Sequence, residues 1–206
     1  MTAIVTAQPT PTLAAVPLNH PALIRHVRDW SDRDQIHKAV MTLFRPDLPG
    51  PQDQRRGTAG ILYRVEHRPH PRILLQAAAP PARTDYGIRV TDLTGVIANL
   101  HPGGRVHLRV DINAVRCQSR TGRRLPVPDS ELQGWLTARL EPGLRNVEIL
   151  DAPVTVGRAG NHPLRVAHIA ATATVNDPLA LTELINNGVG RGKAYGCGLL
   201  TVLPAL

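Results

Sequence analysis

The sequence predicts an α+β protein built from two successive domains with antiparallel sheets. Two kinds of pattern support this prediction: short segments in which apolar and polar residues alternate, as in strands with one buried face, and segments whose apolar residues recur every three or four positions, as in amphipathic helices. Both kinds occur in each half of the chain, approximately in the order strand, helix, two strands, weak helix, strand. The 206 residues, 42% of them hydrophobic, suffice for two domains of about 100 residues each.

The first half opens with residues 1–11, which are rich in Thr, Ala and Pro and show no periodicity, so we expect a flexible arm there. Residues 12–18 then read as a strand. The capping-box pattern Ser31-Asp32-Arg33-Asp34 predicts the start of a helix, with Asp34 reaching back to the cap. The apolar face of this helix ends before Pro46 and consists of Ile36, Val40, Leu43 and Phe44.

Two further strands are expected at residues 60–67 and 72–78, joined as a hairpin. Residues 79–100 are ambiguous, since a proline-rich stretch precedes a possible short helix at 92–100. The next strand is expected at residues 106–110, after the break at Pro102-Gly103-Gly104.

The second half repeats the pattern of the first. We expect Asp129 to cap a helix whose apolar residues are Leu132, Trp135, Leu136 and Leu140. Strands at 147–150, 154–156 and 165–175, a helix that begins at Pro178 and a final strand at 199–203 follow. This order is typical of ferredoxin-like (RRM-like) domains, with helices on one face of an antiparallel sheet. We therefore predict two tandem ferredoxin-like domains, at residues 12–100 and 105–206.

A glycine-rich run at residues 188–198 separates the last helix from the last strand. Its five glycines can adopt positive φ and lie close to another surface, and Arg191 and Lys193 add positive charge where backbone N–H groups are accessible. That combination favours a partner that carries phosphate.

The overall charge supports an acidic partner as well, because the formal net charge is +8 and the isoelectric point is about 10.7. The residues we expect to contact the phosphates of a partner lie in three basic loops of the second half: Arg120, Arg123, Arg124, Arg158, Arg165, Arg191 and Lys193. The alternatives are solvated charged loops, or a general basic DNA-binding protein. No helix suited to reading the major groove stands out.

Aromatic residues make up only 3% of the chain. A protein that binds single strands by stacking several bases normally exposes more rings on its sheet. The composition therefore favours recognition of backbone and shape, as in a duplex or hairpin.

No familiar metal or nucleotide motif occurs. Gly192-Lys193 is followed by Ala194, where a Walker A loop has Ser or Thr, and no nucleophile elbow, His-Glu-x-x-His motif or carboxylate cluster is present. Cys117 and Cys197 form no close pair, so we expect reduced thiols and no zinc. We accordingly predict no metal and no cofactor.

His37 is the candidate acid–base group, because it follows Ile36 at the edge of the apolar face of the first helix. An imidazole there is anchored by the protein yet can reach a ligand, and it titrates near neutral pH. The alternative is a half-buried structural histidine. No apolar run of about 18 residues and no signal peptide is evident, so we expect no membrane association and a cytoplasmic location.

Several segments together resemble a known family. They are residues 28–37 (RDWSDRDQIH), 62–66 (LYRVE), 74–76 (LLQ), 107–110 (HLRV) and the ending 186–200 (NNGVGRGKAYGCGLL). They resemble the CRISPR repeat endoribonuclease of type I-E systems, the CasE (Cse3) family, in order from about Thr12 to Leu203.

This resemblance implies tandem ferredoxin-like domains and metal-independent cleavage of precursor CRISPR RNA on the 3′ side of the repeat stem-loop. It also implies attack by a 2′-hydroxyl, with 2′,3′-cyclic phosphate and 5′-hydroxyl products. The enzyme then stays on the mature crRNA as a subunit of Cascade, beside the other subunits. His37 matches the catalytic histidine of the family.

Relatives carry a tyrosine three residues before this histidine, where the present chain has Asp34. A carboxylate cannot replace a phenol as a proton donor at neutral pH, so we interpret Asp34 as a cap residue. Catalysis then depends on His37, with Lys38 or Lys193 stabilising charge in the transition state. The alternative is a non-catalytic subunit that binds an RNA hairpin.

Overall fold

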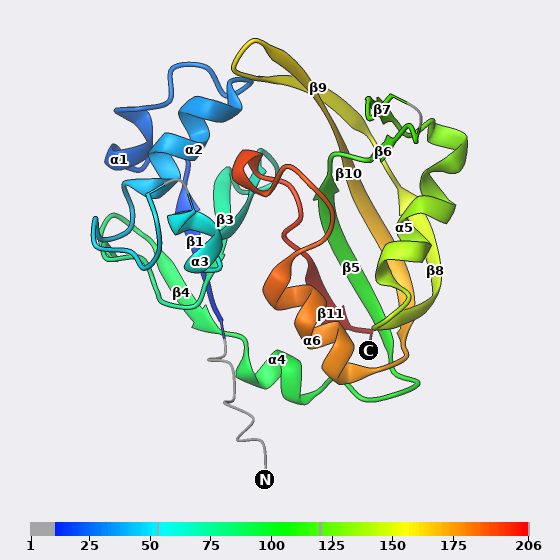
Figure 1. Ribbon diagram of the computed structural model, residues 1–206. Coiled ribbons are helices and arrows are strands. Elements are labelled where there is room, and N and C mark those ends of the chain that lie inside the picture. The colour runs from blue at the N-terminus through cyan, green and yellow to red at the C-terminus, as the bar shows by residue number, and fades with distance from the viewer. Residues whose placement is uncertain (1–10, 53, 120, 206) are drawn as a thin grey trace, which may run out of the picture.

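The computed structural model describes residues 11–52, 54–119 and 121–205. The strands form a four-stranded sheet, a five-stranded sheet and a two-stranded ribbon (Figure 1). Of the predicted arm at 1–11, only Pro11 is described, and Arg120 also lies outside the described residues.

The first sheet has the strand order β2-β3-β1-β4, and each neighbouring pair is antiparallel. The strands are β1 (Thr12–Pro17), β2 (Leu62–Glu66), β3 (Arg72–Ala77) and β4 (Arg89–Asp92). Three helices lie between β1 and β2: α1 (Pro21–Ile24), α2 (Arg33–Met41) and α3 (Arg55–Thr58). Ile36 and Val40 of α2 pack with Val16, Tyr63 and Ile73 of the sheet, so α2 covers one face of it.

The second sheet has the equivalent order β11-β5-β10-β8, again antiparallel, with β9 added along β10. Its strands are β5 (Arg105–Ile112), β8 (Leu144–Asp151), β9 (Val154–Ala159), β10 (His162–Val175) and β11 (Thr201–Pro204). The ribbon consists of β6 (Val115–Cys117) and β7 (Arg124–Pro126). The helices are η1 (Asp129–Glu131), α5 (Leu132–Leu140), α6 (Pro178–Asn187) and η2 (Lys193–Tyr195).

Both sheets therefore show the order of a ferredoxin-like domain, and the predicted fold class of two such units with antiparallel sheets is confirmed. In the second unit α5 and α6 lie on one face, where Leu136 and Leu181 are fully buried against Val110 and Ile169.

The prediction for residues 79–100 missed a strand. The fourth strand of the first sheet is β4, and α4 (Thr94–Ala98) follows it instead of preceding it. All four residues of β4 are exposed, because it is an edge strand paired only with β1. It therefore lacks the alternation by which the other strands are predicted.

Two predicted helix caps were wrong by a few residues. The N-cap of α2 is Asp32, whose side chain accepts hydrogen bonds from the backbone N–H groups of Asp34 and Gln35, whereas Ser31 donates to Asp29. Asp32 with Gln35 three residues later has the capping-box spacing that we attributed to Ser31 and Asp34. Asp129 begins the short η1 helix and does not cap α5.

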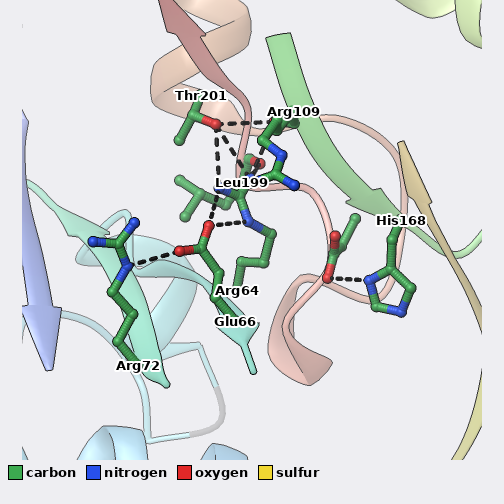
Figure 2. Close-up of polar contacts among 8 residues, drawn as sticks. Arg64, Glu66, Arg72, Arg109, His168, Leu199 and Thr201 are labelled. Carbon is green, nitrogen blue, oxygen red and sulfur yellow. Dashed lines mark hydrogen bonds and ion pairs between the residues drawn. The ribbon is translucent and has the colours of Figure 1, made fainter. Parts of the chain in front are cut away.

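The two sheets meet through a buried arginine, as Figure 2 shows. Arg64 of β2 pairs with Glu66 at 2.7 Å and donates to the backbone carbonyl of Arg109 and to the hydroxyl of Thr201 in the second unit. Glu66 also accepts from Arg72. Burial is tolerated because the charge is paired and its donors are used.

Candidate active site and nucleic-acid interface

His37 lies on α2, half-buried, and its Nδ1 is buried without a hydrogen-bond partner among the described residues. Burial lowers the pKa of His37 below its ordinary value, and the positive charges of Arg56 and, to a smaller extent, Lys38 lower it further. The negative charge of Asp34 acts in the opposite direction and raises this pKa. The imidazole is therefore neutral at neutral pH, which is the form that can accept a proton.

Lys193 lies on η2 of the glycine-rich loop, and η2 packs against α2. Burial lowers the pKa of Lys193, and so does the charge of Arg56. Because Arg56 acts on both His37 and Lys193, the three basic groups lie in one neighbourhood although they come from α2, α3 and η2.

Arg56 is a candidate site residue that sequence reasoning missed. Its guanidinium donates to the backbone carbonyl of Ile61 at 2.6 Å, which anchors it at the start of β2. Nothing in the pattern Gln54-Arg55-Arg56-Gly57 distinguishes it from a surface arginine. Lys38, which the sequence offered beside His37, is exposed on α2.

The glycine-rich loop has the conformation that its composition permits. All five of its glycines have positive φ, from +71° at Gly188 to +88° at Gly198. A Cβ at Gly198 would lie 2.7 Å from the backbone carbonyl oxygen of Val189, so no side chain fits there. Figure 1 shows the loop, in orange and red, between the two sheets.

Contacts with both domains hold this loop in place. The hydroxyl of Tyr63 donates to the carbonyl of Ala194 at 2.6 Å, and the N–H of Gly198 donates to the carbonyl of Asp111 on β5 at 2.7 Å. The backbone of the loop is therefore held against α2 by hydrogen bonds to both domains, and Lys193 has a defined position in it.

The β9–β10 hairpin of the second unit reaches the N-terminus of α2. The backbone N–H of Arg158 donates to the carbonyl of Ser31 at 3.0 Å. The Arg158 guanidinium lies 3.1 Å from the carboxylate of Asp29 and 3.3 Å from that of Asp32, the N-cap of α2. Hydrogen bonds from Ser31 hold the pKa of Asp29 below its usual range, and those from Gln35 do the same for Asp32.

Three of the arginines that the sequence singled out line one groove of about 750 Å³ in the second unit. Arg124 comes from β7, Arg165 from β10 and Arg191 from the glycine-rich loop. Arg165 pairs with Asp129, whereas Arg124 and Arg191 form no ion pair within the described residues. Arg123 is exposed in the turn of the β6–β7 ribbon.

The described part of the chain contains no group of three or more His, Cys, Asp or Glu side chains that could hold a metal ion. Within the same residues, no helix combines the length and the apolar character needed to cross a membrane. Cys117 and Cys197 are both free.

Comparison with known proteins agrees with the fold. A family model described as CRISPR associated protein matches residues 13–204. The CRISPR system Cascade subunit CasE of Escherichia coli (strain K12) is 27% identical in an alignment 201 residues long, gaps included, and this alignment covers 86% of this chain and 95% of that protein.

Solved structures show the same likeness. One of CRISPR endoribonuclease Cse3 bound to 19-nucleotide RNA has a TM-score of 0.71 at 25% identity, covering 94% of this chain and 98% of that one. Thermus thermophilus Cse3, bound to an RNA representing a pre-cleavage complex, has a TM-score of 0.71 at 24% identity and covers 95% of this chain and 100% of that one. The resemblance found in the sequence is thereby confirmed, and the chain belongs to the family of CRISPR associated proteins, as a type I-E protein of the CasE (Cse3) group.

Proposed function

We propose that this protein is a metal-independent endoribonuclease that binds the repeat stem-loop of precursor CRISPR RNA, cleaves it on the 3′ side of the stem and stays bound to the mature crRNA. The observation that carries the proposal is the neutral, half-buried imidazole of His37, near the cations Arg56 and Lys193. The names of the relatives, a Cascade subunit and an RNA-bound endoribonuclease, support the RNA substrate.

The chemistry follows from these groups. His37 accepts the proton of the 2′-hydroxyl next to the scissile phosphate, and the 2′-oxygen forms a bond to phosphorus. The bond from phosphorus to the 5′-oxygen breaks, and this oxygen takes a proton from water. The products are a 2′,3′-cyclic phosphate and a 5′-hydroxyl. Lys193 stabilises the negative charge of the transition state, with Lys38 as the alternative cation.

Affinity comes from the arginines around the site. Arg123, Arg124 and Arg191 are free to contact RNA phosphates in the stem or next to it, and we propose that Arg120, Arg158 and Arg165 contact phosphates of the stem. Because Arg158 and Arg165 must leave carboxylate partners to do so, we expect them to contribute less to affinity. We also propose that the protein works in the cytoplasm with the other Cascade subunits.

A non-catalytic hairpin-binding subunit is the second candidate, because Asp34 places a carboxylate one helical turn before His37, where it repels a phosphate. One assay separates the two candidates. The repeat RNA is incubated with the protein in EDTA, beside an RNA with a single 2′-deoxy substitution at the cut. We expect cleavage of the first RNA and survival of the second.

His37→Ala should abolish cleavage while RNA binding persists, and His26→Ala, which alters an exposed histidine outside α2, should leave cleavage unchanged. Tight binding of an RNA that is never cut would establish the non-catalytic subunit instead. Equal affinity for duplex DNA and the RNA hairpin would establish a general DNA-binding protein.

A further inference from the structure

The glycine-rich loop presents an aromatic ring as well as cations to the arginine groove. Tyr195, the last residue of η2, lines the groove together with Arg124 and Arg191. The half-buried side chain packs against the buried residues Leu164 and Val166 of β10. The same side chain lines the groove, so it is anchored by buried residues of the second unit and in contact with the groove.

The turn that carries Tyr195 is held in one conformation. The backbone N–H of Tyr195 donates to the carbonyl of Gly192 at 2.8 Å. Gly192 and Gly196, which lie on either side of the turn, have φ of +76° and +80°. The preceding carbonyl, that of Ala194, accepts the hydroxyl of the fully buried Tyr63. A ring held in this way loses little conformational freedom when a ligand stacks on it.

The charges around the ring select an anionic ligand. The backbone of Arg191 pairs with that of Asn113, which holds the arginine beside the groove. Arg191 and Arg124 form no ion pair in the described part of the chain, while Arg165 is neutralised by Asp129. A volume of about 750 Å³ lies within the ordinary range for sites that hold small molecules or single nucleotides.

Other rings of the chain lack this combination. Phe44 and Tyr63 are buried, Trp135 has the Arg139 guanidinium 4.2 Å from its ring centroid, and Tyr86 stacks edge-on with His20 in the first unit. Trp30 lines a different cavity. Among the Phe, Trp and Tyr residues that the structure describes, Tyr195 alone lines the groove of Arg124 and Arg191, which also contains the exposed imidazole of His162.

We propose that Tyr195 is the stacking platform of a subsite for one unpaired nucleotide next to the RNA stem, with the phosphates of that nucleotide on Arg191 and Arg124. This proposal rests on the proposed function, since it assumes that the ligand is the repeat RNA. Base–aromatic stacking tolerates any base, because every base has a π-face. The subsite therefore recognises an unstacked nucleotide and not a sequence.

The test couples changes in the protein to changes in the RNA. Dissociation constants are measured for the repeat hairpin with its unpaired flanking nucleotides, and for a series in which each flanking nucleotide in turn is abasic. We expect one abasic position to weaken binding by the wild-type protein about tenfold. Tyr195→Ala should weaken binding of the intact RNA by a similar factor but have little further effect on that abasic RNA.

Tyr195→Phe, which keeps the ring, should bind as the wild type does, and Tyr195→Leu, which keeps the packing on Leu164, should behave like Tyr195→Ala. Tyr86→Ala, at an exposed ring in the other domain, is the matched control and should not change RNA binding.

Two results would overturn the proposal. The first is that no abasic position weakens binding by the wild-type protein, and this result does not depend on whether any variant folds. The second is that the losses of affinity from Tyr195→Ala and from the abasic site simply add. Absence of any hairpin binding by the wild type would overturn the proposed function together with the subsite, whereas normal binding and cleavage without coupling would overturn the subsite alone.

Discussion

The hydroxyl of Tyr63, on β2 of the first domain, donates a 2.6 Å hydrogen bond to the backbone carbonyl of Ala194, in the glycine-rich loop of the second. Burial raises the pKa of Tyr63 far above its ordinary value, so the phenol remains protonated and remains a donor. This bond fixes Lys193 and Tyr195, the neighbours of Ala194, with respect to the domain that carries His37.

Removing this hydroxyl tests whether the bond positions the loop. Tyr63→Phe should lower the free energy of unfolding by about 1 kcal/mol, as measured by urea denaturation. It should also slow cleavage of the hairpin at saturating RNA, because Lys193 is less well placed. Full activity of a Tyr63→Phe protein that has lost the expected stability would show that the loop is held by its other contacts.

The positive φ angles of the glycine-rich loop predict which glycines tolerate substitution. Gly198→Ala should destabilise the protein by about 2 kcal/mol or more, since φ is +88° and the new Cβ would meet the carbonyl of Val189. Gly134→Ala, in the exposed part of α5 with nothing within 4 Å of the new Cβ, is the matched control and should stabilise by about 0.5–1 kcal/mol. Comparable midpoints of thermal unfolding for the two variants would refute this account.

The charges around His37 predict opposite shifts in pH dependence. Its folded-state pKa is lowered, so the active base form is present at neutral pH and is lost as pH falls through that pKa. Arg56→Gln removes a positive charge, raises the pKa and should move the acid limb of the pH–rate profile to higher pH. Asp34→Asn removes a negative charge and should move that limb to lower pH. Shifts of the same sign in both variants would exclude His37 as the titrating group.

Arginines with and without carboxylate partners should differ in the salt dependence of RNA binding. Arg191→Ala should reduce the slope of log affinity against log salt by about one, the expectation for one lost phosphate contact. Arg158→Ala should reduce it less, because the guanidinium pairs with Asp29 and Asp32, and should lower the melting temperature of the free protein slightly. A full unit of slope lost in Arg158→Ala would mean that phosphate replaces both carboxylates in the complex.

Much of the fold could be predicted because each piece is encoded locally. The alternation in β5 and the apolar spacing in α2 and α5 are properties of neighbouring residues. Edge strand β4 escaped prediction because Arg89–Asp92 are all exposed and no apolar face marks them. The resemblance to the family could also be recognised from the sequence, because the glycine pattern at 188–198 lies in one continuous segment.

The candidate site was less accessible from the sequence. His37 and Lys193 were chosen from motifs, and their assignment as site residues stays a prediction. Arg56 carries no motif and is distinguished only because α3 places it beside both groups. The ion pairs of Arg158 and Arg165 were also invisible, since their carboxylate partners lie far away in the chain.

The sequence by itself determined the two domains, the glycine-rich loop and the family, because local periodicity, capping and the conformational freedom of glycine depend on residues close in the chain. Only the tertiary structure decided what surrounds the helix of His37: the loop against α2, Arg56 near both His37 and Lys193, and the β9–β10 hairpin on Asp32. The loop and the hairpin come from the second domain, and their contacts with α2 depend on sheet order and domain packing, which no local pattern specifies.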